Sequence, residues 1–545
     1  MLKMYDNKMN NTKNINTEKN TDTQPLSERG SNRSQRPRSE NFKKFIGSNW
    51  GPRPSDLPKR ADSADWAAKR REELSKLFKD DCLIIPAGPL KVRNNDCDYR
   101  FRPHSSFAHL TGLGTDQEPD AVLVLHPKTA NADVEDDDEI TDAKITSSHT
   151  NHEAVLYFRP RASRKSEEFY ADSRYGELWV GVRPSIAEIQ AQTGIKCEHI
   201  DNFIANIRKD SAFCQLAVVS DSDPNITEIV NEIRRENLVG EGSTAIAQSK
   251  QYEQKDAKLR EQLSTLRLCK DSWEIDQIQQ AINKTKKGFE QIIRSLPRAI
   301  EHTRGERVVE GAFAAVSREE GNGLGYETIA ASGNNANTLH WICNNGKVRE
   351  GEMILVDAGI EMDSLYTADI TRTLPVNGKF SDIQKKIYQA VLDAADRAFE
   401  VANTKGALFK DMHAAALEVL AHRLEDWGIL PVTAEQSLKP EGQFHCRWMV
   451  HGTSHHLGLD VHDCALARRE MYLDAKLEPG MCFTIEPGLY FRADDLSVPE
   501  EFRGNAVRIE DNICMESEGK AVRMSENIPR KIEDVENWMK NILNK

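Results

Sequence analysis

The sequence predicts an α+β protein in which a smaller α/β domain precedes a larger α+β domain. Three observations support this prediction. Short apolar runs of strand length alternate with helical segments over residues 63–262. Longer amphipathic helices are interleaved with strands over residues 263–545. The chain has 545 residues, which exceeds the size of one ordinary hydrophobic core, so two or more domains are expected.

Residues 1–62 are predicted to be a disordered, basic, low-complexity tail. Asn, Lys, Thr, Ser, Arg and Pro dominate this segment and offer too little apolar surface to offset the entropy of the chain. A basic tail could bind an acidic partner, but a solvated tail is the favoured interpretation. The whole chain carries a net charge of -13, which argues against nucleic acid as its main partner.

Residues 63–262 alternate between predicted helices and strands. A charged helix is expected from Ala64 to about Phe78, and a charged, mostly helical segment over residues 228–262. An acidic stretch at about 131–149 is interpreted as a solvated loop inserted between two strands. The strands are predicted at residues 82–86, 121–125, 154–158 and 216–219, with helices over residues 186–193 and 200–207.

Residues 263–545 contain cleaner helix signals. Asp271 with Glu274, and Ser381 with Gln384, have the spacing of a capping box that opens a helix. Further helices are predicted around residues 308–316 and from near residue 411 to residue 427, and strands are predicted at residues 353–357, 370–374, 481–485 and 506–509.

The ten cysteines are scattered, and none forms a CxxC pair. They are interpreted as free thiols in a reducing, cytoplasmic environment. A catalytic thiol is the minor alternative, with Cys343 and Cys464 as its candidates. No stretch approaches the roughly 20 apolar residues that cross a bilayer, so no membrane partner is expected.

Five metal-type side chains in the last two hundred residues predict a metal centre. The acids stand at or near the ends of apolar strands, where an unpaired carboxylate is costly to bury. Arg372 could pair with Asp369 instead, and Arg508 could orient Glu510. Four carboxylates need about four positive charges, which two divalent cations supply. The five residues are Asp357, Asp369, His455, Glu486 and Glu510.

Four histidines lie within residues 451–462, where glycines are interleaved with them. Core histidines are usually solitary, so this density favours a site. His455 is the candidate ligand, and His456 is interpreted as a packing residue or a neighbour of the ligands.

These segments resemble the pita-bread metallopeptidase family that includes aminopeptidase P, prolidase and methionine aminopeptidase. The resemblance covers roughly residues 263–515. Tyr99-Arg-Phe-Arg102 and Leu110-Thr-Gly112 resemble the aminopeptidase P branch. The matching segments are Val356-Asp-Ala-Gly359, Ala368-Asp-Ile-Thr-Arg-Thr-Leu-Pro375, residues 451–463, Thr484-Ile-Glu-Pro-Gly488 and Val507-Arg-Ile-Glu-Asp511.

The resemblance implies a pita-bread catalytic domain at residues 263–545 that releases an N-terminal residue when proline is second. It implies that Asp369 and Glu510 bridge two divalent metal ions, most plausibly Mn²⁺ because the ligands are oxygen-rich. Asp357 would bind one ion, and His455 and Glu486 the other. Such a pair holds a bridging water and lowers its pKa.

Other residues have roles that rest on the same resemblance. Glu486 is the expected general base. His340 resembles the substrate-binding histidine of the family, and His462 would stabilise the oxyanion or orient the substrate. His451 is a weaker candidate for a residue that contacts the substrate beside His462. The expected partners are peptides with a penultimate proline and further copies of the chain in a dimer or tetramer.

Three alternatives stay open. A prolidase would cleave only Xaa-Pro dipeptides. A family member that lost its metals would be a binding protein on the same fold, although the intact ligand set argues against this. A creatinase-type amidinohydrolase is a weaker option, because such relatives lack this set of acids.

Overall fold

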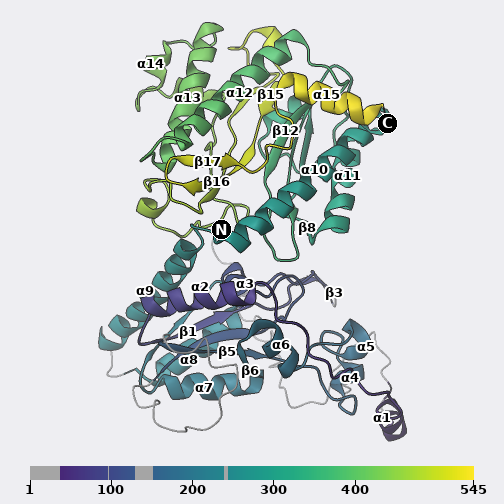
Figure 1. Cartoon of the computed structure of the whole chain (residues 1–545), viewed down its shortest axis with the longest axis vertical. Coiled ribbons are helices and arrows are strands. Elements are labelled where there is room, and N and C mark those ends of the chain that lie inside the picture. The colour runs from purple at the N-terminus through teal and green to yellow at the C-terminus, as the bar shows by residue number, and fades with distance from the viewer. Residues whose placement is uncertain (1–36, 38, 96, 129–150, 239–242, 545) are drawn as a thin grey trace, which may run out of the picture. The chain divides into compact units, whose positions relative to one another are not determined.

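The computed structural model describes residues 37, 39–95, 97–128, 151–238 and 243–544 (Figure 1). The predicted acidic insert and most of the predicted tail lie outside these residues. The described residues divide into two compact units, one within residues 1–59 and 159–191 and the other within residues 60–158 and 192–545. None of the helices in the described part combines the length and the apolar character that crossing a membrane requires.

The first unit includes part of the segment predicted as a disordered tail. There the chain differs from the prediction, because Ser39 caps helix α1 (Glu40–Ile46) by accepting a hydrogen bond from the backbone of Phe42. Trp50 then packs edge-on against Phe169, with ring centroids 5.3 Å apart. These aromatic residues give the end of the tail an apolar surface that the overall composition of the segment conceals. The other short helices are α4 (Glu168–Ala171) and α5 (Glu177–Val180), and α6 (Ile186–Thr193) contributes residues to both units.

The second unit begins with a mixed five-stranded sheet of order β6-β5-β4-β1-β7. Strand β1 is antiparallel to β4 and parallel to β7. Helices α7 and α8 bury one face of this sheet, and Figure 1 shows α2 and α3 over the other. The strands are β1 (Asp81–Pro86), β4 (Val122–Pro127), β5 (His152–Phe158), β6 (Lys196–His199) and β7 (Gln215–Val218). The helices are α2 (Ala64–Leu77), α3 (Ser105–Thr111), α7 (Phe203–Asp210), α8 (Pro224–Glu236) and α9 (Ser243–Leu266), and a short hairpin joins β2 (Val92–Asn94) to β3 (Cys97–Asp98).

The C-terminal region has two halves, each with a pair of packed helices and an antiparallel sheet (Figure 1). The first half contains the helices α10 (Ser272–Glu301) and α11 (Gly305–Glu320) and the strands β8 (Gly323–Leu324), β9 (Ile329–Ser332), β10 (Met353–Ala358), β11 (Ile360–Glu361) and β12 (Ile370–Pro375). The second half contains the helices α12 (Asp382–Ala402), α13 (Phe409–Asp426), α14 (Ala434–Ser437) and α15 (Ile532–Leu543) and the strands β13 (Cys482–Ile485), β14 (Gly488–Phe491), β15 (Asn505–Arg508), β16 (Asp511–Ser517) and β17 (Lys520–Arg523).

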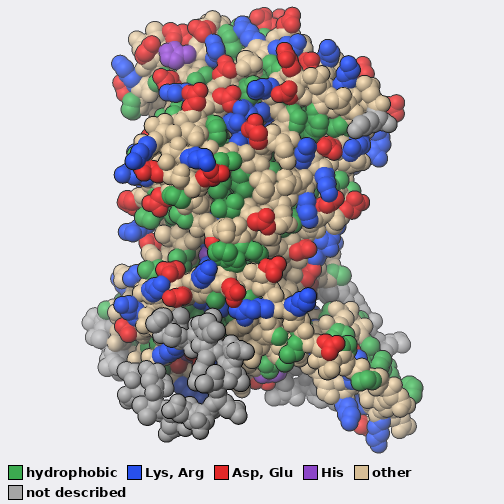
Figure 2. All heavy atoms as spheres, viewed as in Figure 1, with side chains coloured by type: hydrophobic (Ala, Val, Ile, Leu, Met, Phe, Trp, Pro, Cys, Tyr) green, Lys and Arg blue, Asp and Glu red, His purple; other side chains and the backbone are tan. Residues whose placement is uncertain are grey.

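The predicted capping boxes explain where two long helices of this region begin. The side chain of Asp271 accepts a hydrogen bond from the backbone of Glu274, and the backbone of Asp271 donates to the side chain of Glu274, which confirms the predicted start of α10. Ser381 and Gln384 do the same for α12. Both helices pack against one large hydrophobic core that also includes the strands. On the face drawn in Figure 2, acidic and basic side chains are interspersed over the C-terminal region.

Candidate metal centre

All five predicted metal ligands line one cavity of about 540 Å³ in the C-terminal region. Asp357 lies in the central strand β10, and Asp369 stands one residue before its neighbour β12. Glu486 directly follows β13, and Glu510 lies between β15 and β16. The sheets of the two halves therefore each deliver two carboxylates to the same cavity.

A short segment beside β13 positions the histidine. The backbone of Thr484 donates to the carbonyl of His455 at 2.9 Å, and the backbone of Glu486 donates to that of Thr453 at 2.8 Å. This pairing brings His455 beside Glu486. His456, one residue on, points the other way, is fully buried and stacks on Phe409, which confirms its packing role.

The ligand atoms lie within the reach of shared cations. The Nε2 atom of His455 is 3.2 Å from Oδ2 of Asp369, 3.6 Å from Oε1 of Glu486 and 4.0 Å from Oε1 of Glu510. One ligand atom each from Asp369, His455 and Glu510 lies within 4.8 Å of the others. Asp357 joins this group through a hydroxyl that it shares with Asp369.

That hydroxyl belongs to Tyr326, which the sequence analysis missed. Its oxygen lies 2.7 Å from Oδ1 of Asp357 and 2.5 Å from Oδ1 of Asp369. Tyr326 stands in a loop behind a glycine cluster, and nothing in its local sequence signals a role at the site. Asn512 was not predicted either. Its side-chain amide accepts a hydrogen bond from the backbone N–H of Asp369 and donates one to the carbonyl of Asp369.

Both arginines have partners other than those suggested by the sequence. Arg508 donates through Nη2 to Oδ2 of Asp357 at 2.6 Å, so it orients that carboxylate and not the carboxylate of Glu510. Arg372 is fully buried and pairs with Asp511 at 2.7 Å, which leaves Asp369 for the centre. Neighbouring residues of an extended chain point in opposite directions, so Asp511 turns away from the cavity that Glu510 lines.

The four carboxylates carry more negative charge than the neighbouring cationic side chains neutralise. Burial, reinforced by neighbouring carboxylates, raises the pKa of Glu510 well above its usual value and that of Glu486 to about 7. Burial also raises the pKa of Asp357 despite Arg508. For Asp369 burial has the same tendency, but hydrogen bonding and charge from His455 prevail and lower its pKa. A hard, anionic donor set of this kind fits divalent cations.

The remaining predicted histidines lie around the same cavity. His340 and His462 are exposed at its wall, and the ring of His462 meets that of His455 with centroids 4.3 Å apart. His451 lies 2.7 Å from the hydroxyl of Tyr490 through Nε2. Burial, with Arg508 nearby, lowers the pKa of His451 to about 3, so this ring is neutral at pH 7.

The thiol alternative finds no support in this cavity. Cys464 is buried, and burial raises the pKa of its thiol, which disfavours the nucleophilic thiolate. Cys343 is exposed. Neither residue is among those that line the cavity in the described part of the chain.

Comparisons with known proteins agree with this architecture. The family model for metallopeptidase family M24 matches residues 276–517, and the model for the aminopeptidase P N-terminal domain matches residues 67–215. The chain is 42% identical to Xaa-Pro aminopeptidase 1 of Streptomyces coelicolor over 89% of its own length and 88% of the relative. It is 28% identical to human Xaa-Pro aminopeptidase 3 over 89% and 87% of the two chains.

Solved structures show the same likeness. Pseudomonas aeruginosa aminopeptidase PepP superposes with a TM-score of 0.71 at 25% identity, over 90% of this chain and all of that one. Zinc-substituted Escherichia coli aminopeptidase P in complex with product gives a TM-score of 0.71 at 26% identity, over 88% and 99%.

Fold and sequence thus define a metal-dependent peptidase, and the predicted α+β fold class with a pita-bread domain is confirmed. More narrowly, the chain belongs to the Xaa-Pro aminopeptidases of metallopeptidase family M24. It is a hydrolase, and membership of this family implies divalent metal ions.

Proposed function

We propose that the chain is a dinuclear aminopeptidase that releases the N-terminal residue from peptides with proline in second position. The observation that carries the proposal is the convergence of four carboxylates and one imidazole in one cavity. The names of the relatives support the substrate class. The proposal assigns residues 63–262 to the N-terminal domain and residues 263–545 to the catalytic domain.

The five ligands divide between two cations. Asp369 and Glu510, each buried near the middle of the cluster, would bridge both ions. Asp357 would hold one ion, and His455 and Glu486 the other. When bound, two divalent cations lower the pKa of a water molecule and stabilise negative charge on the scissile carbonyl oxygen.

Glu486 is the proposed general base. Its carboxylate lines the cavity with its side chain partly accessible, so it can reach both a water molecule and the leaving group. It would accept the proton of the attacking water and pass it to the proline nitrogen. The cost of burying its charge favours such a proton transfer.

Histidines on the cavity wall would bind the substrate. His340 and His462 are exposed there and can donate to the peptide, with His462 supporting the oxyanion. His451, whose Nδ1 faces the carbonyl of Gly452 at 2.8 Å and lies 3.7 Å from Oε2 of Glu486, is the weaker candidate for the same role.

The cavity also offers an apolar wall. A proline ring needs an apolar surface of this kind, and its tertiary amide resists ordinary peptidases. The proposed wall consists of Ile329, Leu339, Ile342 and Val461.

Manganese is the proposed metal because the ligands are oxygen-rich. The proposed location is the cytoplasm, since none of the ten cysteines forms a disulfide. A homodimer or homotetramer is the proposed assembly.

A peptide-cleavage assay tests the proposal. The chain, stripped of metal by a chelator, is given Mn²⁺, Co²⁺ or Zn²⁺ and then an Xaa-Pro dipeptide or an Xaa-Pro-Xaa peptide. Mn²⁺-dependent release of the first residue from the longer peptide is the expected result. Cleavage of the dipeptide alone would favour the prolidase alternative, and absence of both metal binding and cleavage would favour a binding protein.

A further inference from the structure

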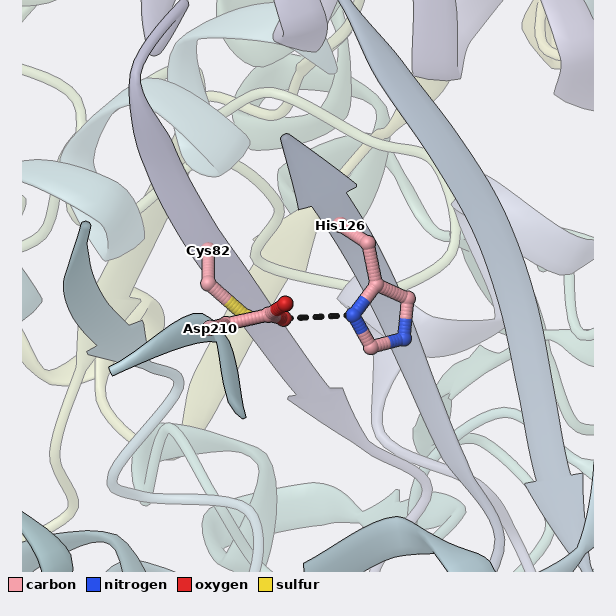
Figure 3. Close-up of side chains that lie close together, drawn as sticks. All are labelled: Cys82, His126 and Asp210. Atoms are coloured by element: carbon pink, nitrogen blue, oxygen red, sulfur yellow. Dashed lines mark hydrogen bonds and ion pairs between the residues drawn. The ribbon is translucent and has the colours of Figure 1, made fainter. Parts of the chain in front are cut away.

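A second group of metal-type side chains lies in the N-terminal sheet, outside the cavity described above. Cys82, His126 and Asp210 each offer one ligand atom, and these atoms lie within 4.8 Å of one another. Figure 3 shows the sulfur of Cys82 beside the carboxylate of Asp210, which faces the imidazole of His126. The Nδ1 atom of His126 is 2.5 Å from Oδ2 of Asp210.

Three elements of the sheet layer bring these residues together. The antiparallel register of β1 and β4 pairs Leu83 with Leu125, so the next pair along places Cys82 directly opposite His126. Side chains directly opposite each other in neighbouring strands project from the same face of the sheet. Asp210 is the last residue of α7, the helix that packs on this face.

The charges of this group suit a single divalent cation. Cys82 is fully buried and Asp210 nearly so, and burial together with the Asp210 carboxylate raises the pKa of the Cys82 thiol well above its usual value. A cation bound here would hold Cys82 as a thiolate. The thiolate and the carboxylate would then supply two negative charges, which one dication neutralises.

His126 has the hydrogen bond that a metal-binding histidine usually makes through its other nitrogen. Its Nε2 lies 2.9 Å from the hydroxyl of Tyr157, and that oxygen also accepts a hydrogen bond from Asn206 at 2.9 Å. An Nε2–H donated to Tyr157 leaves the lone pair of Nδ1 free to face a cation. In the structure Nδ1 faces Asp210 as a hydrogen-bond donor. A bound cation would take the place of that proton, and the ring would then donate Nε2–H to Tyr157.

Cys214 is a further cysteine nearby, but it does not belong to the group whose ligand atoms lie within 4.8 Å of one another. Cys214 follows α7, and its backbone donates to the carbonyl of Asp210 at 2.9 Å. It packs against the same apolar cluster as Cys82, and burial, with the Asp210 carboxylate nearby, raises the pKa of its thiol to about 12. Sulfur, nitrogen and one carboxylate oxygen are the donors of tetrahedral zinc sites.

We propose that Cys82, His126 and Asp210 hold a structural zinc ion in the N-terminal domain. The ion would fasten the end of α7 to strands β1 and β4. The site is separate from the proposed catalytic pair, because its ligands come from a different sheet and include a thiolate. The competing interpretation is a hydrogen-bonded network that binds no metal.

Cobalt spectroscopy on the full-length chain separates the two interpretations. Co²⁺ is added to metal-free, reduced protein, and the near-ultraviolet sulfur-to-cobalt charge-transfer band is recorded. No cysteine is among the residues that line the catalytic cavity in the described part of the chain, so cobalt there gives no such band. The expected result is a band whose final intensity corresponds to one thiolate-bound cobalt per chain, whatever the total cobalt bound, and which disappears when Zn²⁺ displaces the cobalt.

Two variants assign the band. Cys82→Ser should abolish it, whereas Cys197→Ser, which changes another buried cysteine of the same sheet, should leave it intact. Cleavage of Xaa-Pro peptides at 25 °C should be the same in both variants. If Cys82→Ser lacks the circular-dichroism spectrum of the wild type, Asp210→Asn replaces it and should weaken zinc binding at least tenfold. Three outcomes would overturn the proposal. The wild-type chain could lack the band, the band could survive Cys82→Ser, or zinc affinity could be unchanged in Asp210→Asn.

Discussion

The hydroxyl of Tyr326 lies 2.5 Å from Oδ1 of Asp369 while also touching Asp357. A tyrosine has one hydroxyl proton, so it cannot donate to both carboxylates at once. Burial, followed by the charge of Asp357, raises the pKa of Tyr326 well above its usual value, so the proton stays on the tyrosine. The hydroxyl therefore lies between the two carboxylates and orients the one to which it donates.

We predict that Tyr326→Phe lowers metal affinity by about 10- to 100-fold, as expected when a residue that orients metal ligands loses its hydrogen bond. The measurement is the Mn²⁺ concentration that restores half of the activity to metal-free enzyme. Tyr388→Phe is the matched control, because the hydroxyl of this buried tyrosine bonds only to the carbonyl of Arg530 among the contacts the structure describes. Equal affinities of the two variants would remove Tyr326 from the centre.

A second prediction concerns the proposed general base. Glu486→Gln should keep the fold and lower kcat by about 10²- to 10⁴-fold, since the amide cannot accept the proton of the attacking water. Asp369→Ala should lose metal as well as activity. Metal content by mass spectrometry and kcat at saturating Mn²⁺ distinguish the two effects. A glutamine variant with a near-normal rate would show that Glu486 is not the base.

The same cluster shows how far sequence reasoning reaches. The meeting of the four acids in one cavity could be predicted because each stands at or near the end of an apolar strand, a position where burial of an unpaired carboxylate demands a partner. The residues that orient them, Tyr326 and Asn512, could not, because their roles depend on side chains 31 or more positions away in the chain. The partners of Arg372 and Arg508 were mistaken for the same reason.

The secondary structure divides in a similar way. Helices that begin with a capping box or show clear periodicity, such as α10 and α12, start where the sequence predicts. Strands such as β14, β16 and β17 were not predicted. β14 and β17 have four residues each, too few to show a clear pattern, and β16 contains buried polar residues such as Asn512 that interrupt its apolar run. The helix α1 was hidden by the polar composition of the segment around it.

A third prediction concerns the loop that carries His340. Glu306 is fully buried, and its Oε1 accepts hydrogen bonds from the backbone of Ser332 and the side chain of Asn335, at 2.8 and 2.9 Å. Its Oε2 accepts from the indole of Trp341 at 2.9 Å and from a further backbone N–H. The carboxylate thus ties β9 to the residue beside His340.

Glu306→Gln should lower both the free energy of unfolding and the activity. The amide group faces two of the four donors, and each buried donor left without an acceptor costs about 1–3 kcal/mol. Denaturant unfolding and kcat/KM give the two readouts. The control is Glu352→Gln, whose partly exposed carboxylate accepts only from Ser332 and Arg349 among the contacts the structure describes. Full activity in a destabilised Glu306→Gln enzyme would show that the loop does not depend on this anchor.

A fourth prediction separates substrate binding from folding at His340. This side chain is exposed on the cavity wall, so His340→Ala should leave the free energy of unfolding within about 0.5 kcal/mol of the wild type. The value of kcat/KM for an Xaa-Pro-Xaa peptide should fall at least tenfold, because the histidine would donate to the bound peptide. Parallel losses of stability and activity would indicate a packing role instead.

The last prediction concerns acid stability at Glu274. This buried carboxylate accepts a hydrogen bond from Tyr366 at 2.6 Å and faces His109 and Arg70, at 3.4 and 3.6 Å. Burial alone would raise its pKa, but the hydrogen bond with His109 and the charge of Arg70 outweigh it and hold the pKa far below its usual value. Burial lowers the pKa of His109 itself, so Arg70 is the cation that faces Glu274 at pH 7. A folded-state pKa below the unfolded one stabilises the fold above the unfolded pKa, and this stabilisation is lost as the pH falls.

Glu274→Gln should therefore destabilise the chain by about 3 kcal/mol at pH 7, because it leaves buried cationic and polar partners without their anion. The difference from the wild type should narrow as the pH falls below about 4.5, where the unfolded wild-type chain begins to take up the proton. Urea unfolding of both chains between pH 7 and pH 4 measures it, and Glu290→Gln, on the same helix, serves as a control with a partly exposed carboxylate. A difference that stays constant over this range would mean that Glu274 contributes through its shape and hydrogen bonds, and not through its charge.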